Sequence, residues 1–300
     1  MSRFSKNIIT IICFFSFLGC SSAKIKNRAV SNLTSNFSQE ILANEARLRL
    51  FKSDSSEVNW FFIAGGPGLS SDYFLDLVKS LKVRGNLWLV DFPDRPIAKI
   101  QDSQEIFARW QDSLINLAKT YQNPIFVGHS FGGMIVLQTS ELEKLLTGLV
   151  LFSTSPDSTW PELRETSEMK LAVDLYSRSK TASNYKNLIK FYSPYYFTNP
   201  SIGDDFFEQI QYFPHADTIS GWFFTQYKYS WVPSPKNSLI ITGSKDKIQP
   251  ISLYDSAPEF NRLRERAILI QNAAHFPWVE NLKGTVSAFE SFASFLNLVE

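Results

Sequence analysis

The sequence predicts an α/β fold built on a mostly parallel sheet. Three observations carry this prediction: short apolar runs recur along the chain, helical patterns separate them, and glycine-rich segments directly follow two of the runs. The composition is that of a globular protein, with 44% hydrophobic and 20% charged residues among 300. A chain of this length buries a large core without the help of disulfides or metals.

The N-terminal segment predicts an export signal rather than part of the fold. Arg3 and Lys6 precede an apolar run over residues 8–18, which is short for a bilayer-spanning helix but fits the core of a signal peptide. Gly19-Cys20 then resembles the lipobox of bacterial lipoproteins. In those proteins the cysteine is lipidated on its thiol and becomes the first residue of the mature protein. The resemblance implies a signal peptide at residues 1–19 and lipidation of Cys20. An uncleaved anchor and plain secretion are the alternatives.

Residues 20–40 are rich in Ser, Asn and Lys and predict a solvated tether between the lipid and the folded domain. The expected location is the bacterial cell envelope, on the outer membrane or the periplasmic face, with the membrane as a partner through the lipid. Loss of Arg3 and Lys6 with the signal peptide changes the formal charge from +1 to −1. Because the chain has no basic block, we expect no nucleic-acid partner.

The folded domain is predicted to begin at residue 41 and to alternate strands with helices. Its strands are expected at 46–51, 58–63, 87–91, 124–128, 148–152, 238–242 and 267–270. Helical patterns cover 72–83, 103–121, 131–142 and 283–298. Segment 155–236 breaks this alternation, since it is strongly aromatic and has proline near both edges. It predicts a mainly helical cap inserted into a core formed by residues 41–154 and 237–300.

A candidate nucleophile lies in residues 128–133, which are Gly-His-Ser-Phe-Gly-Gly. The pattern Gly-x-Ser-x-Gly around Ser130 is weak alone, but here a strand pattern precedes it and a helical pattern follows. This is the setting of a nucleophile elbow, a strained turn on which larger side chains two residues away would collide with backbone. The following helix also directs its first N–H groups toward developing negative charge.

A serine nucleophile needs a general base, and the chain has only three histidines. His129 adjoins the serine, so its side chain should diverge from that of Ser130, and we interpret it as structural. His215 lies in the aromatic insertion, where a substrate contact and a surface position are equally consistent. His275 follows the last predicted strand, at the sheet edge where α/β enzymes collect catalytic groups, and is the predicted base.

The predicted partner of that histidine is Asp246, on the loop after strand 238–242. The order Ser130, Asp246, His275 is the one expected for this arrangement. Asp255 is a rival further from the strand end. Asp91 also ends a strand but precedes the nucleophile, so we assign it either a structural role or one in support of the catalytic residues.

The loop after strand 58–63 is Ala64-Gly65-Gly66-Pro67-Gly68 and predicts a backbone donor to an oxyanion. The second donor would be the N–H of Phe131, the residue after the nucleophile. No cofactor or metal is needed by this chemistry.

Residues 45–300 resemble the α/β-hydrolase superfamily, which implies an α/β-hydrolase fold with a helical cap. The run Gly65-Gly66-Pro67-Gly68 is similar to the His-Gly-Gly-Pro-Gly loop of proline-iminopeptidase-like members, which implies that Gly66 is the oxyanion donor. Ala64 replaces the usual His of that loop, and Ala274 stands where Gly commonly precedes the histidine. The Gly-His-Ser-Phe-Gly-Gly elbow is closer to esterases and lipases of the fold.

The sequence therefore predicts a serine hydrolase acting on a small-molecule ester or peptide-like substrate through an acyl-enzyme. The aromatic cap favours carboxylic esters of apolar or aromatic compounds. The alternative is an aminopeptidase of the proline-iminopeptidase type, which needs a cap carboxylate for the free α-amino group. Two further hypotheses are a protein of this fold that only binds its ligand, and an enzyme of this fold that does other chemistry. That chemistry would be acyl transfer to another acceptor or a peroxide-linked halide reaction. The candidate carboxylates for binding the α-amino group in the aminopeptidase alternative are Asp204, Asp205, Glu208 and Asp217.

Overall fold

The computed structural model describes residues 37–43, 45–93, 100, 102–159 and 166–298. The predicted signal peptide, Cys20 and most of the predicted tether lie outside these residues. Within the described parts, no helix is both long and apolar enough to cross a bilayer.

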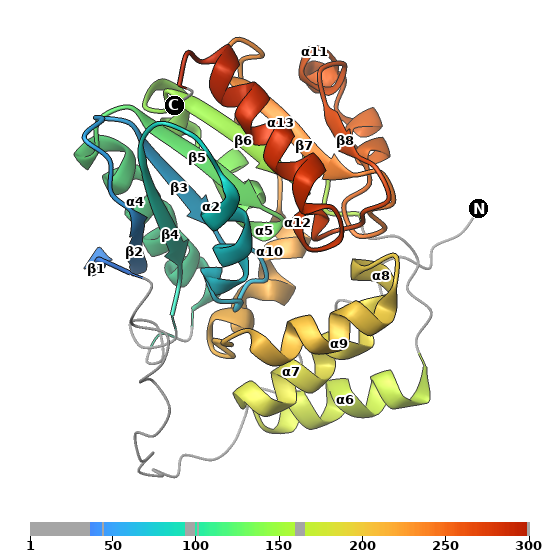
Figure 1. Cartoon of the computed structure of the whole chain (residues 1–300). Helices are drawn as coiled ribbons and strands as arrows, with labels where there is room; N and C mark the ends of the chain where they lie inside the picture. Colours follow the sequence, from blue (N-terminus) through green and yellow to red (C-terminus); the bar gives the residue numbers. More distant parts are fainter. Residues whose placement is uncertain (1–36, 44, 94–99, 101, 160–165, 299–300) are drawn as a thin grey trace.

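An eight-stranded sheet forms the centre of the domain, in the order β1-β2-β4-β3-β5-β6-β7-β8 (Figure 1). β1 and β2 pair in antiparallel fashion at one edge, and the strands from β4 to β8 are parallel. The strands are β1 (Gln39–Ala43), β2 (Ala46–Lys52), β3 (Asn59–Ile63), β4 (Asn86–Asp91), β5 (Pro124–His129), β6 (Gly148–Phe152), β7 (Ser238–Gly243) and β8 (Ile268–Ile270).

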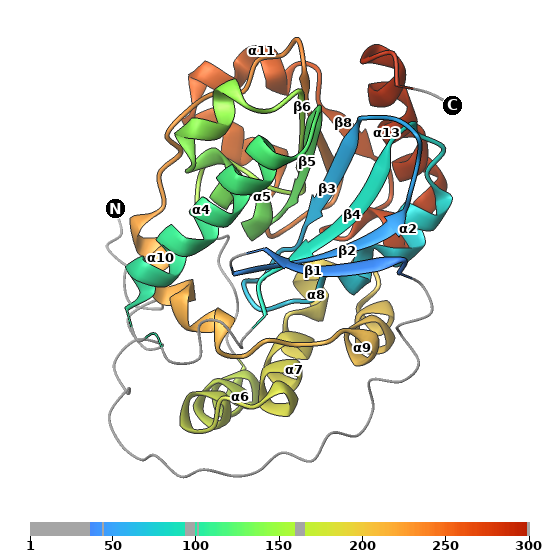
Figure 2. The same ribbon diagram turned by 90° about the vertical axis from the view of Figure 1, so that its left-hand side faces the viewer.

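Helices cover both faces of the sheet, which explains why its central strands are apolar throughout. Figure 2 shows α4 and α5 on one face and α2 and α13 on the other. Along β3, Trp60 and Phe62 pack into the α2 and α13 layer, whereas Phe61 and Ile63 pack into the α4 and α5 layer. The core helices are α2 (Leu75–Ser80), α4 (Ser103–Thr120), α5 (Phe131–Leu137), α11 (Asn261–Arg264), α12 (Pro277–Glu280) and α13 (Leu282–Phe295).

The segment between β6 and β7, which we call the cap, is mainly helical where the structure describes it. Its first helices form a separate layer beside the sheet (Figure 1), while α10 packs on α4 through contacts of Phe107 with Trp222 and Phe223. An isolated bridge between Leu69 and Tyr212 joins this segment to the loop after β3. The helices are α6 (Ser167–Arg178), α7 (Ala182–Phe191), α8 (Ser193–Tyr196), α9 (Pro200–Gln209) and α10 (Ser220–Gln226).

The predicted fold class is confirmed, and each predicted strand is present within two residues of its expected bounds. Two details differ. The expected tether boundary at residue 40 falls inside β1, a short edge strand with little apolar alternation that pairing with β2 stabilises. The helical patterns over 72–83 and 131–142 are shorter helices joined to 3₁₀ turns, at Ser71–Phe74 and Ser140–Lys144.

Candidate active site

Ser130 occupies a strained turn between β5 and α5. Its backbone has φ 52° and ψ −123°, a conformation that L-residues seldom adopt. A Cβ added to Gly128 would lie 2.5 Å from the Gly133 Cα, and one added to Gly132 would lie 2.6 Å from the carbonyl oxygens of Ile63 and Ala64. The glycines are therefore required by space. His129 and Phe131 are buried, whereas Ser130 is partly exposed, so the turn presents the serine alone.

His275 and Asp246, which are distant in sequence, form a buried pair. The imidazole Nδ1 lies 2.9 Å from Asp246 Oδ2 and 3.2 Å from Oδ1. Asp246 Oδ1 also accepts hydrogen bonds from the backbone N–H groups of Ile248 and Gln249, at 2.8 and 2.9 Å. A carboxylate held in this way fixes the ring, leaving Nε2 as the nitrogen that can accept a proton. The rival Asp255 is instead paired with Arg264 at the surface.

His129 is buried between the elbow and the loop of His275. Its Nε2 lies 3.0 Å from the carbonyl oxygen of His275, which can only accept, so Nε2 carries the hydrogen. Its Nδ1 then accepts from the Tyr73 hydroxyl at 3.0 Å. Burial, with a further effect of His275, holds the pKa of His129 well below its ordinary value, which fits a neutral ring. His215, in contrast, lies exposed in the cap.

The loop after β3 lies against the elbow. A Cβ added to Gly65 would be 3.0 Å from the Ser130 Cβ, and the Gly65 N–H donates to the Tyr73 hydroxyl. Gly66 has φ 118°, which favours glycine. The N–H groups of Gly66 and Phe131, the predicted oxyanion donors, make no hydrogen bond to backbone acceptors of the described residues. Neither N–H group is therefore used by the part of the backbone that the structure describes.

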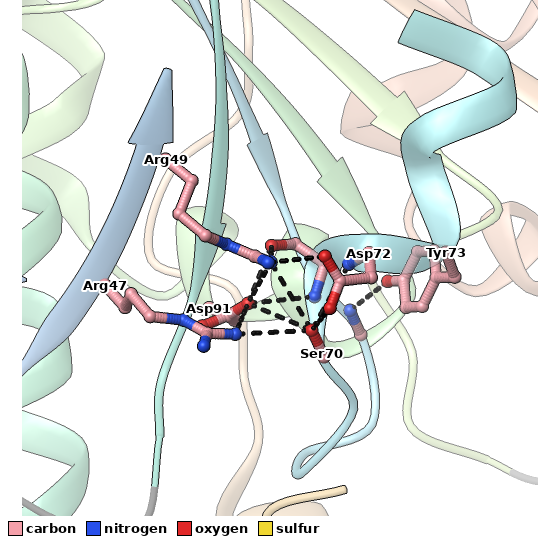
Figure 3. Close-up of polar contacts among 8 residues, drawn as sticks. Arg47, Arg49, Ser70, Asp72, Tyr73 and Asp91 are labelled. Carbon is pink, nitrogen blue, oxygen red and sulfur yellow. Dashed lines mark hydrogen bonds and ion pairs between the residues drawn. The ribbon is translucent and has the colours of Figure 1, made fainter. Parts of the chain in front are cut away.

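A buried ion-pair network holds the far end of this loop (Figure 3). Asp91, at the end of β4, pairs with Arg47 at 2.8 Å and with Arg49 at 3.0 Å. It also accepts from the N–H and hydroxyl of Ser71, and Arg49 further pairs with Asp72. Burial would raise the pKa of Asp91, but the two guanidinium groups outweigh it and lower that pKa. The structural role predicted for Asp91 is therefore to fasten the loop to β2 and β4.

The cap contacts the same elements. The His275 N–H donates to the Tyr196 carbonyl at 3.0 Å. The Tyr185 hydroxyl donates to the carbonyl of Pro67 in the loop after β3, at 2.6 Å. Glu280 accepts from the N–H groups of Ala274 and Thr198, both at 2.7 Å. These residues lie far apart in the chain, and no sequence motif marks them.

A small cavity opens beside the elbow, with a volume of about 10 Å³. That is roughly the room that one water molecule needs. The cavity is lined by Ala64, Gly65, Pro67, Gly68, Leu69, Phe92, Trp110 and Phe131.

Across the described part of the chain, no group of three or more His, Cys, Asp and Glu side chains is placed to hold a metal ion.

The four candidate carboxylates for an amine differ in their surroundings. Asp204 and Asp205 are exposed on α9, and Glu208 forms surface ion pairs with Lys186 and Lys190. Asp217 is only partly exposed, and it accepts hydrogen bonds from Tyr176 at 3.0 Å and Ser220 at 2.7 Å. Asp217 lies near the loop after β3, since its backbone nitrogen is 3.4 Å from a Cβ added to Gly68.

The alpha/beta hydrolase family matches the chain over residues 61–288. This match covers more than half of the chain, from β3 to α13. The chain belongs to the alpha/beta hydrolase family, and we conclude that it is a hydrolase. No curated protein sequence matches the chain.

Solved structures share the fold at low sequence identity. An esterase from Thermogutta terrifontis has a TM-score of 0.64 and 14% identity, covering 86% of this chain and 99% of its own. A putative aryl esterase from Burkholderia cenocepacia has a TM-score of 0.60 and 13% identity, covering 86% and 98%. A bromoperoxidase from Bacillus anthracis has a TM-score of 0.59 and 13% identity, covering 85% and 100%. At these identities the likeness shows the fold alone.

Proposed function

We propose that this hydrolase cleaves carboxylic esters with Ser130 as nucleophile, His275 as general base and Asp246 as the residue that orients the histidine. The observation that carries the proposal is the buried His275–Asp246 hydrogen bond, together with a serine on a strained, partly exposed turn whose neighbour His129 donates to the His275 carbonyl. His275 takes the proton of the serine hydroxyl as its oxygen attacks the ester carbonyl. The N–H groups of Gly66 and Phe131 stabilise the oxyanion that forms.

The leaving alcohol departs with the proton from His275, which leaves an acyl group on Ser130. A water molecule then attacks this acyl-enzyme, again giving a proton to His275, and the acid is released as the serine is restored. The apolar and aromatic lining of the cavity fits an ester better than a charged amine. The two solved esterase structures that share this fold also support an ester as the substrate.

An aminopeptidase would need a carboxylate free to bind an α-amino group. Asp217, the best placed of the four candidates, already accepts hydrogen bonds from Tyr176 and Ser220. Amino-acyl arylamides should therefore be poor substrates beside esters of the same leaving group. Arylamide turnover that Asp217→Asn abolishes would favour the peptidase instead.

The first test is labelling by a fluorophosphonate probe, with residues 21–300 as the protein. We expect covalent labelling of the parent protein and none of Ser130→Ala, because only an activated serine displaces the leaving group of the probe. Ester turnover should fall at least about a thousandfold in Ser130→Ala and in His275→Ala.

His215→Ala serves as the matched control for His275→Ala, since His215 lies exposed in the cap. It should label and turn over at close to the parent rate. Undiminished labelling of Ser130→Ala would overturn the assignment of the nucleophile.

We also propose that the mature protein is attached to the bacterial cell envelope through a lipid on Cys20. This proposal rests on the sequence of residues 1–22 alone.

A further inference from the structure

Glu280, the last residue of α12, joins two separate parts of the molecule through its two carboxylate oxygens. Oε2 accepts a hydrogen bond from the backbone N–H of Ala274, at 2.7 Å. Oε1 accepts from the backbone N–H of Thr198, also at 2.7 Å, and from the hydroxyl of the same threonine. Ala274 directly precedes the proposed base His275, whereas Thr198 lies in the cap. One side chain therefore binds the loop of the base and the cap at the same time.

The backbone around His275 is held at three polar groups, each by a residue from a different part of the chain. The Ala274 N–H donates to Glu280. The His275 N–H donates to the Tyr196 carbonyl at 3.0 Å, and the His275 carbonyl accepts from His129 at the same distance. The position of the imidazole therefore depends on these backbone contacts as well as on the hydrogen bond to its Nδ1.

The contact between Glu280, the base loop and the cap requires a carboxylate. Lengths of 2.7 Å are typical of hydrogen bonds to an ionised acceptor, which are about twice as strong as bonds between neutral groups. A glutamine at this position would offer one oxygen, and its amide NH₂ group would face a backbone N–H that it cannot accept from. Either the bond to Ala274 or the bond to Thr198 would then be lost. The change of Glu280 to glutamine thus breaks the bridge without changing the size of the side chain.

We propose that Glu280 is a positioning residue of the ester hydrolysis described above. It holds the backbone before His275 so that Nε2 stays aligned with the Ser130 hydroxyl and the leaving alcohol, and its bonds to Thr198 make this alignment depend on the cap. Proton transfer to the leaving group is sensitive to a displaced imidazole, because it requires hydrogen-bond distance. This inference rests on the proposed function and adds a residue that acts through the base.

The test compares two esters of butyric acid that differ in how much the leaving group needs a proton. p-Nitrophenoxide leaves without one, whereas benzyl alcohol leaves from benzyl butyrate only as His275 protonates it. We expect Glu280→Gln to lower kcat/KM by about thirtyfold for benzyl butyrate and by about threefold for p-nitrophenyl butyrate, so that the ratio of the two values changes about tenfold. A smaller amount of folded protein would lower both values equally and leave the ratio unchanged.

Glu290→Gln is the matched control, since it makes the same chemical change on α13, where the carboxylate accepts from the Lys82 N–H at 3.4 Å. It should keep the parent ratio. Thr198→Ala removes the hydroxyl bond to Glu280 and keeps the backbone N–H that donates to it. This variant should change the ratio in the same direction by about two- to threefold, because the bridge loses one hydrogen bond on the cap side. Melting curves establish that each variant is folded.

An unchanged ratio in folded Glu280→Gln would overturn the inference and assign Glu280 a role in stability alone. An unchanged ratio in Thr198→Ala, beside the expected change in Glu280→Gln, would overturn the dependence on the cap. If Glu280→Gln does not fold, the ratio in Thr198→Ala decides the proposal. Failure of the proposed function looks different, because the parent protein would then cleave neither ester and take up no probe.

Discussion

At the level of single residues, the proposed nucleophile and base are positioned by side chains that take no part in the chemistry. Tyr73 accepts a hydrogen bond from Gly65 and donates one to His129, and His129 donates to the carbonyl of His275. One chain of hydrogen bonds thus links the loop of the proposed oxyanion donor, the elbow and the loop of the base. Ala64, which replaces the histidine of similar loops, contributes no side-chain hydrogen bond to this chain.

Tyr73→Phe should slow catalysis as well as destabilise the fold. The change leaves the Gly65 N–H and the Nδ1 of His129 without their partner, at a cost of about 1–3 kcal/mol for a buried polar group. We expect kcat to fall about tenfold while KM changes less than about threefold, because misplaced oxyanion donors act mainly in the transition state. Steady-state kinetics and melting temperature measure the two effects.

Tyr212→Phe is the matched control, since it removes a buried hydroxyl that donates to the Phe207 carbonyl within the cap. It should lower the melting temperature and leave kcat near the parent value. Equal losses of kcat in the two variants would show that Tyr73 acts through general stability alone.

At the level of elements, polar groups hold the cap together and tie it to the core, in addition to aromatic packing. Asp217, at the turn before α10, accepts from Tyr176 of α6, and Tyr185 of α7 donates to Pro67 in the loop after β3. Burial raises the pKa of Asp217 to about 6, although the hydrogen bonds from Ser220 and Tyr176 lower it. The cap therefore contains an acid that holds its proton more tightly when the protein is folded.

Asp217→Asn should stabilise the protein near neutral pH and not in acid. Between the ordinary carboxyl pKa of about 4 and the folded value of about 6, the folded state binds more protons than the unfolded state. The free energy of unfolding thus falls as pH rises through this window, and the destabilisation caused by the ionised carboxylate persists at higher pH. We expect the variant to gain on the order of 1–3 kcal/mol at pH 8 and nothing at pH 4.

Melting temperatures of the two proteins between pH 4 and pH 8 measure this difference. Asp204→Asn, an exposed change on α9, should match the parent protein across the range. A gain by Asp217→Asn that did not vary with pH would contradict the proposed ionisation.

At the level of the whole molecule, the catalytic domain follows a segment that predicts attachment to a membrane. β1 begins at Gln39, so the polypeptide between Cys20 and the domain is 18 residues long. At about 3.3–3.6 Å per residue, a fully extended segment of this length would span at most about 65 Å. A domain attached in this way would reach substrates well away from the bilayer surface.

Lipidation should depend on one of the two cysteines. The full chain expressed in a bacterial host should incorporate labelled palmitate and enter the detergent phase, whereas Cys20→Ser should do neither, because the acceptor thiol is lost. Cys13→Ser is the control, since Cys13 lies within the predicted signal peptide and should not be needed. Absence of label from the parent protein would contradict the lipoprotein proposal.

The sequence by itself determined the features that depend on local order. The parallel strands are predicted by continuous apolar runs because both faces of each strand are buried. The elbow is predicted because the glycines around Ser130 meet a local steric requirement, and His275 because the chain offers few histidines. β1 was not predicted because an edge strand is held by hydrogen bonds to its one neighbouring strand and needs no apolar pattern.

Only the tertiary structure decided how distant residues meet. The positions of the two carboxylates in space show that Asp246, and not Asp255, is the hydrogen-bond partner of His275. Tyr73 and Trp110 lie near the site, although in the sequence both belong to ordinary helical or apolar patterns. A hydrogen bond between buried groups depends on the packing of several elements at once. No spacing within one segment records that packing, so the contacts that orient the site and shape its cavity are properties of the folded chain.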